Sequence, residues 1–160
     1  MIRPAKLTDL PAIAEIYNDA ILHTTAVFHT DAKDMDYYQN WFNSHTEKHP
    51  VWVYESGGNC VGYVSLSEWS DKCGYDGTQE ISVYVQKDHR GKGIGKQLMQ
   101  AMITHGKELG VVTILSRIAA DNELSIQLHK DLGFITIGNM QKVGYKFGKF
   151  LDVMMMQYVY

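Results

Sequence analysis

The chain has 160 residues, of which 45% are apolar and 21% are charged. Both shares are those of an ordinary globular protein, and the length suits one hydrophobic core. We therefore expect a single domain over residues 1–160, without fibrous or long disordered segments. The 15 basic and 18 acidic side chains leave a net charge of −3. This near-neutral balance gives no electrostatic basis for binding nucleic acid or an anionic membrane.

The apolar runs of the chain are short. Those at 111–115 and 153–156 fall far below the roughly 20 residues that span a bilayer, and the first residues lack the apolar core of a signal peptide. Two cysteines, Cys60 and Cys73, are too few for a disulfide framework or a four-thiolate zinc site. The histidines lack metal-ligand spacing with acidic or thiol partners. We expect a protein of the reducing cytoplasm that holds no metal.

The spacing of apolar and turn-forming residues predicts a mixture of strands and helices. Apolar residues from Leu10 to Ile21 recur at helical spacing, after a cap at Thr8 or Asp9 and with Pro11 in the first turn. In chain order we expect a strand at 2–5, this first helix, a helix at 34–47, a hairpin of strands at 51–55 and 60–66, a strand at 79–85, a helix ending at Gly110, a strand at 111–116 buried on both faces, a helix between Asn122 and Gly133, and strands at 134–140 and 150–158. This order suits one mixed α/β domain.

The strand at 79–85 alternates strictly between polar and apolar residues. Glu80, Ser82 and Tyr84 therefore fall on one face, and three aliphatic residues fall on the other. This places the carboxylate of Glu80 on the side away from the aliphatic core.

The helix that Asn122 caps has two predicted faces. Leu124, Leu128 and Leu132 form its buried stripe, and Asn122, Ser125 and His129 form a polar stripe on the opposite side. Such a polar stripe is also what a plain solvated helix face looks like.

A glycine-rich segment, Arg90-Gly91-Lys92-Gly93-Ile94-Gly95-Lys96, connects the alternating strand to the next helix. Backbone N–H groups at a helix N-terminus form a site for a phosphate, and glycine lets the ligand approach closely. A Walker A loop is excluded because Arg90 stands five positions before Gly95 and Gln97 follows Lys96. A dinucleotide fingerprint fails because the glycines recur at every second residue. A simple glycine-rich turn remains compatible with this segment alone.

Arg90, Gly93 and Gly95 match the pattern Arg/Gln-x-x-Gly-x-Gly/Ala, and the chain resembles the GCN5-related N-acetyltransferase (GNAT) family over nearly its whole length. The subgroup that it most resembles comprises phosphinothricin and methionine sulfone or sulfoximine acetyltransferases, on segments 2–5 leading to 16–18, 80–85 and 143–152. The resemblance implies an α+β fold with a mixed, mostly antiparallel sheet of about seven strands flanked by about four helices. It also implies a homodimer and acetyl-CoA as cosubstrate.

The resemblance further implies how the cofactor is held. The glycine loop would wrap the pyrophosphate, one strand would lend backbone groups to the acetyl and pantetheine portions, and an Asn would contact the cofactor arm. The implied cofactor-binding residues are Val83, Tyr84, Val85, Arg90, Gly91, Lys92, Gly93, Ile94, Gly95, Lys96, Asn122 and Ser125.

Acetyl transfer to an amine requires a base, an acid for the departing thiolate, and donors for the developing oxyanion. Glu80 could take the proton of the ammonium directly or through a water, although an exposed strand carboxylate would give the same pattern. The resemblance places His129 as the proton donor to coenzyme A and a backbone N–H near Val83 at the oxyanion. The implied substrate-binding residues are Phe28, Trp69, Lys72, Gly74, Tyr75, Glu80 and Ser82.

The acceptor implied by this subgroup is the amino group of a small amino acid or its analogue. The loop at 71–77 contains Lys72 but no arginine, whereas similar proteins that hold an amino-acid carboxylate often place arginines there. A polyamine, an aminoglycoside or a protein N-terminus therefore remains open as the acceptor. A non-catalytic acyl-CoA-binding module, which would need the glycine loop but neither Glu80 nor His129, is the alternative outside the enzymes.

Overall fold

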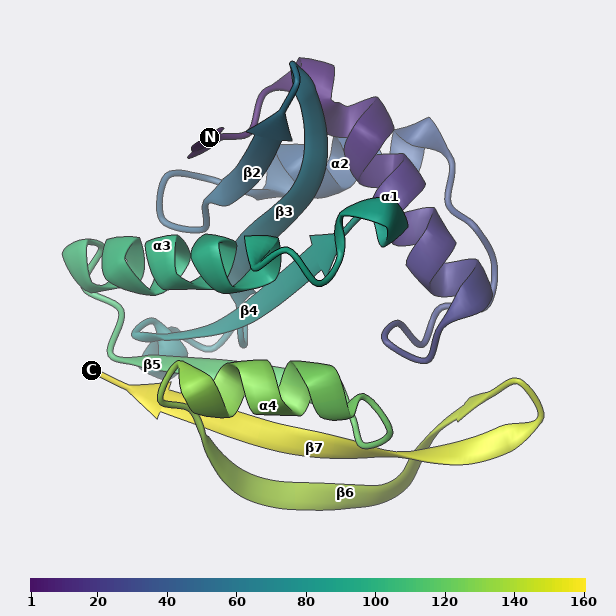
Figure 1. Ribbon diagram of the computed structural model, residues 1–160. Coiled ribbons are helices and arrows are strands. Elements are labelled where there is room, and N and C mark those ends of the chain that lie inside the picture. Colours follow the sequence, from purple (N-terminus) through teal and green to yellow (C-terminus); the bar gives the residue numbers. More distant parts are fainter.

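The computed structural model describes all 160 residues. Its seven strands form one sheet in the order β1-β2-β3-β4-β5-β7-β6 (Figure 1). Neighbouring strands are antiparallel except for β4 and β5, which are parallel. The strands are β1 (Ile2–Pro4), β2 (Val51–Ser56), β3 (Asn59–Glu68), β4 (Thr78–Val85), β5 (Thr113–Ala119), β6 (Ile135–Lys146) and β7 (Lys149–Val159).

Four helices flank the sheet: α1 (Leu10–His23), α2 (Met35–Ser44), α3 (Ile94–Glu108) and α4 (Glu123–Asp131). Short 3-10 turns occur at η1 (Leu7–Asp9), η2 (Cys73–Tyr75) and η3 (Lys87–His89). The expected mixed, mostly antiparallel sheet with four helices is confirmed. None of the helices is long and apolar enough to cross a membrane.

The two faces of the central strands pack against different helices, and the alternation predicted for β4 is confirmed. Ile81 belongs to the larger core cluster, in which Leu98 and Met102 of α3 are fully buried. Tyr84 packs on the other side against a second cluster, which contains Ile13 of α1. Because side chains alternate along a strand, Glu80 and Ser82 share the face of Tyr84. The α1 face of β4 therefore carries the polar side chains.

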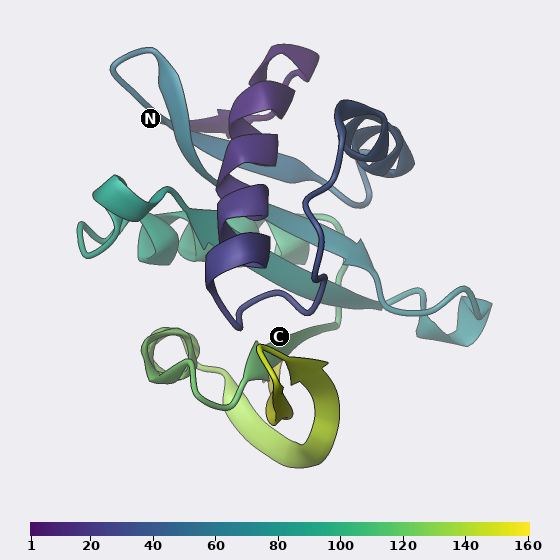
Figure 2. The ribbon, with the colours of Figure 1, turned by 90° about the vertical axis from the view of Figure 1, so that its right-hand side faces the viewer.

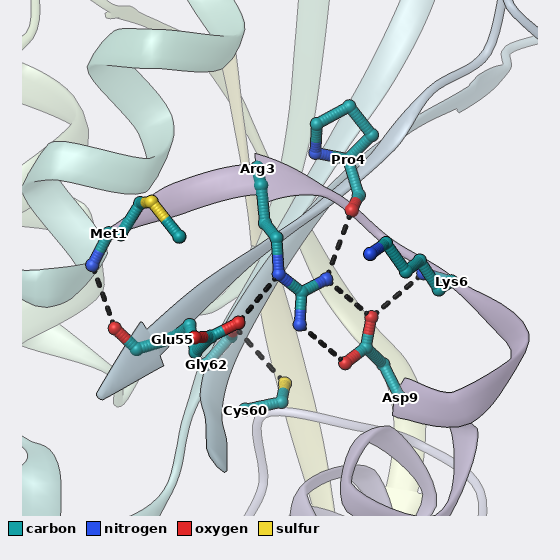
Figure 3. Close-up of polar contacts among 8 residues, drawn as sticks. All are labelled: Met1, Arg3, Pro4, Lys6, Asp9, Glu55, Cys60 and Gly62. Carbon is teal, nitrogen blue, oxygen red and sulfur yellow. Dashed lines mark hydrogen bonds and ion pairs between the residues drawn. The ribbon is translucent and has the colours of Figure 1, made fainter. Parts of the chain in front are cut away.

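An ion-pair network fastens the first strand to the start of α1 (Figure 3). Arg3 donates two hydrogen bonds to the carboxylate of Asp9, at 2.8 and 2.9 Å, and a third to Glu55 of β2 at 2.7 Å. The Arg3 guanidinium is the main cause that lowers the pKa of Asp9. Asp9 stands at the N-cap position of α1, but its side chain accepts from Arg3 and from the N–H of Lys6 and makes no cap bond. The expected helix cap is therefore absent.

The last hairpin is longer than predicted. The strands β6 and β7 continue to a two-residue turn at Phe147 and Gly148, which have φ angles of 51° and 74°. Two positive φ angles match the right-handed twist of a hairpin, but phenylalanine is an uncommon residue in such a turn. The register shifts between Met140 and Gly144, which interrupts the alternation by which a strand is recognised. Figure 1 shows the hairpin reaching past α4 to the C-terminal end of α1.

The predicted faces of α4 are partly wrong. The side chain of Leu124 is 87% exposed, whereas His129 is only 2% exposed and lies on the buried side with Leu132. A hydrogen-bond partner on β5 makes the burial of His129 possible, because a buried polar group requires a partner. Asn122 does cap the helix as expected, since its side-chain oxygen accepts from the N–H of Ser125 at 3.2 Å.

Candidate active site

The parallel strands β4 and β5 stay paired only over Thr78–Glu80 of β4. Beyond Glu80 they diverge, and α3 and α4 lie on the side where they separate (Figure 1). A cavity of about 580 Å³ opens on the α1 face next to this divergence. Its walls come from α1, the segment that follows it, and strands β4 to β7, with the lining residues Tyr17, Ala26, Val27, Phe28, His29, Glu80, Ser82, Tyr84, Arg117, Ala119, Met140, Val143 and Val153.

Glu80 and Arg117 form a two-pronged ion pair at this cavity. The Nε and Nη2 atoms of Arg117 each donate to one carboxylate oxygen of Glu80 at 2.6 Å. Glu80 is the inner partner, with 16% of its side chain exposed against 56% for Arg117. The hydrogen bonds to Glu80 raise the pKa of Arg117. The guanidinium also lies 5.7 Å from the centre of the Trp69 ring, within reach of a cation–π contact.

The aromatic wall of the cavity supplies protonated hydroxyl groups. Tyr17 meets Tyr84 edge-on, with ring centres 5.1 Å apart. Burial raises the pKa of Tyr17 to about 12 and raises the pKa of Tyr84 further. Both phenols therefore keep their protons near neutral pH and can act as hydrogen-bond donors.

Lys146 holds the segment that forms one wall of the cavity. Its ammonium donates to the backbone carbonyls of Ile21, Thr24 and Val27 at 2.5 to 2.7 Å. Only 3% of this lysine is exposed, and burial lowers its pKa. The hairpin β6–β7 is thereby attached to the C-terminal end of α1, where helix carbonyls favour a cation.

His129 lies outside the acceptor cavity and has both ring nitrogens occupied. Nε2 is 2.9 Å from the hydroxyl of Ser116, and Nδ1 is 2.7 Å from the carbonyl oxygen of Ser125. A carbonyl can only accept, so the proton is on Nδ1 and the Ser116 hydroxyl donates to Nε2. Burial lowers the pKa of His129, opposed by the bond to Ser125. The imidazole is consequently neutral at pH 7.

The glycine loop has the conformation of an anion site. Gly91 and Gly93 have φ angles of 74° and 76°, and Gly93 stands at the N-cap position of α3. A Cβ at Gly91 would meet nothing within 4 Å, so the loop leaves open space there. The first N–H groups of a helix have no partner within it and carry partial positive charge. Arg90 and Lys92 brace the loop, donating to the carbonyls of Val85 and Asp88 at 2.9 Å.

The glycine loop adjoins the part of β4 beyond Glu80, where β4 is no longer paired with β5 and its backbone groups on that side have no strand partner. Gly95 lies in the first turn of α3 and faces α4, and a Cβ there would contact Leu128 of α4 at 3.6 Å and Val85 of β4 at 3.7 Å. A side chain larger than a methyl group would therefore enter the region between the two helices. Of the expected cofactor residues, Val83, Tyr84 and Val85 lie on the part of β4 that is not paired with β5, and Asn122 and Ser125 lie at the start of α4. The side chain of Tyr84 lines the acceptor cavity instead.

The expected acceptor residues separate into two groups. Phe28, Glu80 and Ser82 line the cavity. Trp69 does not line it, but its ring lies next to Arg117, which does. The other three residues lie in or beside η2, which extends away from the sheet at the right of Figure 2 and contributes nothing to the cavity lining. These are Lys72, Gly74 and Tyr75.

Sequence reasoning missed Arg117, Tyr17 and Lys146. For Arg117 a signal existed, because Glu80 pairs with Leu115 and residues two apart on a strand share a face. This signal can be used only once β5 is known to lie beside β4, which the sequence alone does not show. No group of three His, Cys, Asp or Glu side chains is arranged to hold a metal ion.

Comparison with known proteins shows the family of the chain. A family model described as "Acetyltransferase (GNAT) domain" matches residues 2–155. The chain is 42% identical over 158 residues to an L-methionine sulfoximine/L-methionine sulfone acetyltransferase of Pseudomonas aeruginosa, covering 98% of this chain and 92% of that protein. It is 40% identical over 157 residues to the L-amino acid N-acyltransferase MnaT of Escherichia coli, covering 98% and 91%.

A solved structure of the putative acetyltransferase yncA from Salmonella typhimurium with its cofactor acetyl-CoA superposes with a TM-score of 0.96 at 38% identity, covering 99% of this chain and 92% of that one. The chain belongs to the GNAT family and is an acetyl-CoA-dependent N-acetyltransferase.

Proposed function

We propose that this chain, as a single domain over residues 1–160, acetylates the α-amino group of a small amino acid or of an analogue such as methionine sulfone, methionine sulfoximine or phosphinothricin. The observation that carries the proposal is the carboxylate of Glu80 in a cavity of about 580 Å³ beside the gap between β4 and β5. A cavity of this size suits a small molecule. The similarity to the Pseudomonas methionine sulfoximine/sulfone acetyltransferase supports the same class of acceptor.

In this proposal the amine attacks the acetyl group directly while both substrates are bound. Acetyl-CoA supplies the acetyl group as a thioester. Glu80 takes a proton from the acceptor ammonium, directly or through a water, and so provides the neutral nucleophile. A backbone N–H near Val83 stabilises the negative charge that develops on the carbonyl oxygen. His129 is assigned to relay the proton that neutralises the departing thiolate, which requires the imidazole to exchange its present bonds, because Nε2 accepts from Ser116 and the Nδ1 proton is bonded to the carbonyl of Ser125.

The cofactor is held, in the same proposal, by the glycine loop and the free edge of β4. The loop N–H groups and Lys96 would meet the pyrophosphate, with Arg90 and Lys92 holding the loop in shape. Trp69, Ser82 and Phe28 would surround the acceptor. Lys72, Gly74 and Tyr75 would join only if the η2 segment moves toward the cavity when the acceptor binds.

The test is release of coenzyme A thiol with a panel of acceptors: methionine sulfone, phosphinothricin, spermidine, an aminoglycoside and a peptide with N-terminal alanine. We expect the two amino-acid compounds to react fastest. Release of thiol with only spermidine, only the aminoglycoside or only the peptide would show that this compound's class, and not the amino acids, is the acceptor. Tight binding of acetyl-CoA without release for any amine would leave a binding module instead of an enzyme.

Replacing Glu80 by Gln tests the base. We expect a fall in kcat of about 10²- to 10⁴-fold, the usual contribution of a general base, with little change in the affinity for acetyl-CoA. Glu68→Gln is the control, because Glu68 is an exposed glutamate on the adjacent strand β3. An unchanged rate in Glu80→Gln would remove Glu80 from this role.

We also propose that the enzyme is a homodimer of the cytoplasm. Support for self-association comes from exposed apolar side chains on the outer strand β6, its turn and the start of β7: Ile135, Ile137, Val143, Tyr145, Phe147 and Phe150. Large exposed apolar patches mark interaction surfaces. Two free cysteines suit a reducing compartment. A monomeric mass in sedimentation at micromolar concentration would contradict the dimer.

A further inference from the structure

We infer that Arg117 selects acceptors that carry a free carboxylate beside the reacting amine, and that it does so by exchanging its bond to Glu80 for a bond to that carboxylate. The inference deepens the proposed function and rests on it. The substrate class that it names is the zwitterionic α-amino acid. Amines without an α-carboxylate are disfavoured at the same site.

The charges that line the cavity form a single adjacent pair. Glu80 supplies the negative charge and Arg117 the positive charge. His29 is the other titratable group of basic character in the lining, and burial lowers its pKa, which favours the neutral ring at pH 7. Lys146 lies behind the wall and directs its ammonium to backbone carbonyls. A carboxylate that enters the cavity therefore meets one cation, Arg117.

The geometry of the pair is that of a two-pronged arginine–carboxylate contact. Both oxygens of Glu80 accept from Arg117 at 2.6 Å. The planar guanidinium fork matches any carboxylate in this way. An α-amino acid brings an ammonium and a carboxylate that are separated by one carbon atom. If it enters the pair, its ammonium takes the place of the guanidinium at Glu80, and its carboxylate takes the place of Glu80 at Arg117.

This exchange leaves no charge without a partner. An amine that lacks the carboxylate can also take the place of Arg117 at Glu80, but it then leaves the guanidinium unpaired. Because Arg117 is 56% exposed, water can solvate the unpaired guanidinium, so the penalty is the loss of a partly exposed bidentate ion pair that the amino acid would have kept. Access to the base Glu80 is thereby coupled to the presence of a carboxylate on the acceptor.

The surroundings of Arg117 allow the exchange. Its side chain is 56% exposed and Glu80 only 16%, so the arginine is the partner with freedom to move. The Trp69 ring, 5.7 Å from the guanidinium, offers a surface along which Arg117 stays near the cavity after it leaves Glu80.

The experiment compares two acceptors that differ only in the carboxylate: L-methionine sulfone and 3-(methylsulfonyl)propylamine. Steady-state kcat and KM are measured for each acceptor, and KM for acetyl-CoA, in the unmodified enzyme, Arg117→Met and Arg117→Lys. The control is Lys107→Met, which removes an exposed cation on α3.

We expect the unmodified enzyme to prefer the amino acid. Arg117→Met should lower kcat/KM for the amino acid by about 30-fold or more, mostly through KM, since a hydrogen bond to a charged group is lost. The same variant should leave the simple amine unchanged or faster, because Glu80 is released. Arg117→Lys should recover part of the amino-acid activity, and Lys107→Met should match the unmodified enzyme.

Equal losses for both acceptors in Arg117→Met would overturn the inference and assign Arg117 a structural role. Lack of preference in the unmodified enzyme would also overturn it, while leaving the acetyltransferase proposal intact. If the unmodified enzyme acetylates none of the amino acids in the panel, the proposed function fails and this inference falls with it.

Discussion

Replacing Lys146 by Met tests whether one buried ammonium fastens the acceptor wall to the rest of the domain. Methionine has a similar shape but cannot donate hydrogen bonds. In the folded chain all three N–H donors of Lys146 point at carbonyls, those of Ile21, Thr24 and Val27. The substitution removes the three bonds at once and leaves three carbonyls at a buried position without their donor.

The expected loss of stability follows from opposing contributions. Leaving a buried polar group unsatisfied costs about 1–3 kcal/mol, so three carbonyls correspond to roughly 3–9 kcal/mol. Removing the ammonium relieves the cost of keeping a charge out of water, which is several kcal/mol. Burial lowers the pKa of Lys146, in the direction that this second contribution requires. We therefore expect a net loss near the lower end, about 3 kcal/mol.

The assay is reversible urea or thermal unfolding, with acceptor kinetics on the same samples. For a chain of this size about 3 kcal/mol corresponds to a fall in Tm of roughly 6–12 °C. We also expect a higher KM for the acceptor and a smaller change in the KM for acetyl-CoA, since the glycine loop meets α1 through the exposed ion pair of Arg90 with Asp19 at 3.5 Å and not through the carbonyls that Lys146 holds. Lys149→Met is the matched control, because Lys149 belongs to the same hairpin but is 58% exposed and lies 3.7 Å from Asp121.

The control should lose less than about 0.5 kcal/mol, as is usual for exposed ion pairs. If Lys146→Met loses no more than Lys149→Met, the ammonium's hydrogen bonds only balance its burial cost. Lys146 would then not stabilise the wall of the cavity.

Three further predictions concern pH, thiols and packing. Burial lowers the pKa of His129 below 6.5 in the folded chain, so the unfolded chain takes up this proton at a higher pH. The free energy of unfolding is therefore undiminished above pH 6.5 and falls, by up to about 1.4 kcal/mol per pH unit, as the pH drops toward the folded pKa. His129→Gln should remove this part of the pH dependence in urea unfolding from pH 7 downward; parallel stability curves for the variant and the unmodified protein would contradict the assignment. Native protein should show one thiol reactive to a disulfide reagent, the exposed Cys73, and a second after unfolding, because burial raises the pKa of Cys60 to about 11; two fast thiols would contradict this burial. Gly144→Ala should cost about 1–3 kcal/mol, because its Cβ would collide with the Phe28 ring, and Phe28→Leu should restore part of the loss in thermal unfolding; no rescue would show that the ring is not the obstacle.

The elements that could be predicted are those whose signal is local. Alternation in β4 separated Glu80 from the aliphatic face correctly, and the paired glycines of the β2–β3 turn have the positive φ angles that a tight hairpin requires. The faces of α4 could not be predicted in the same way. Histidine suits either a solvated or a buried position, and the choice depended on the hydroxyl of Ser116, which lies on another strand.

The two halves of the candidate site differ in how their residues are distributed along the chain. The cofactor half is almost continuous, since β4, the glycine loop and the start of α3 follow one another, so spacing alone separated this loop from other phosphate-binding motifs. The acceptor half is assembled from contacts between distant residues. Arg117 meets Glu80 across 37 positions, and Lys146 reaches Ile21 across 125. Contacts between residues so far apart produce no periodic pattern in a single sequence. The order of strands that brings these residues together is set by the whole fold. In the proposed function, specificity for the acceptor therefore depends on the residues that a single sequence reveals least, while binding of acetyl-CoA depends on those that it reveals best.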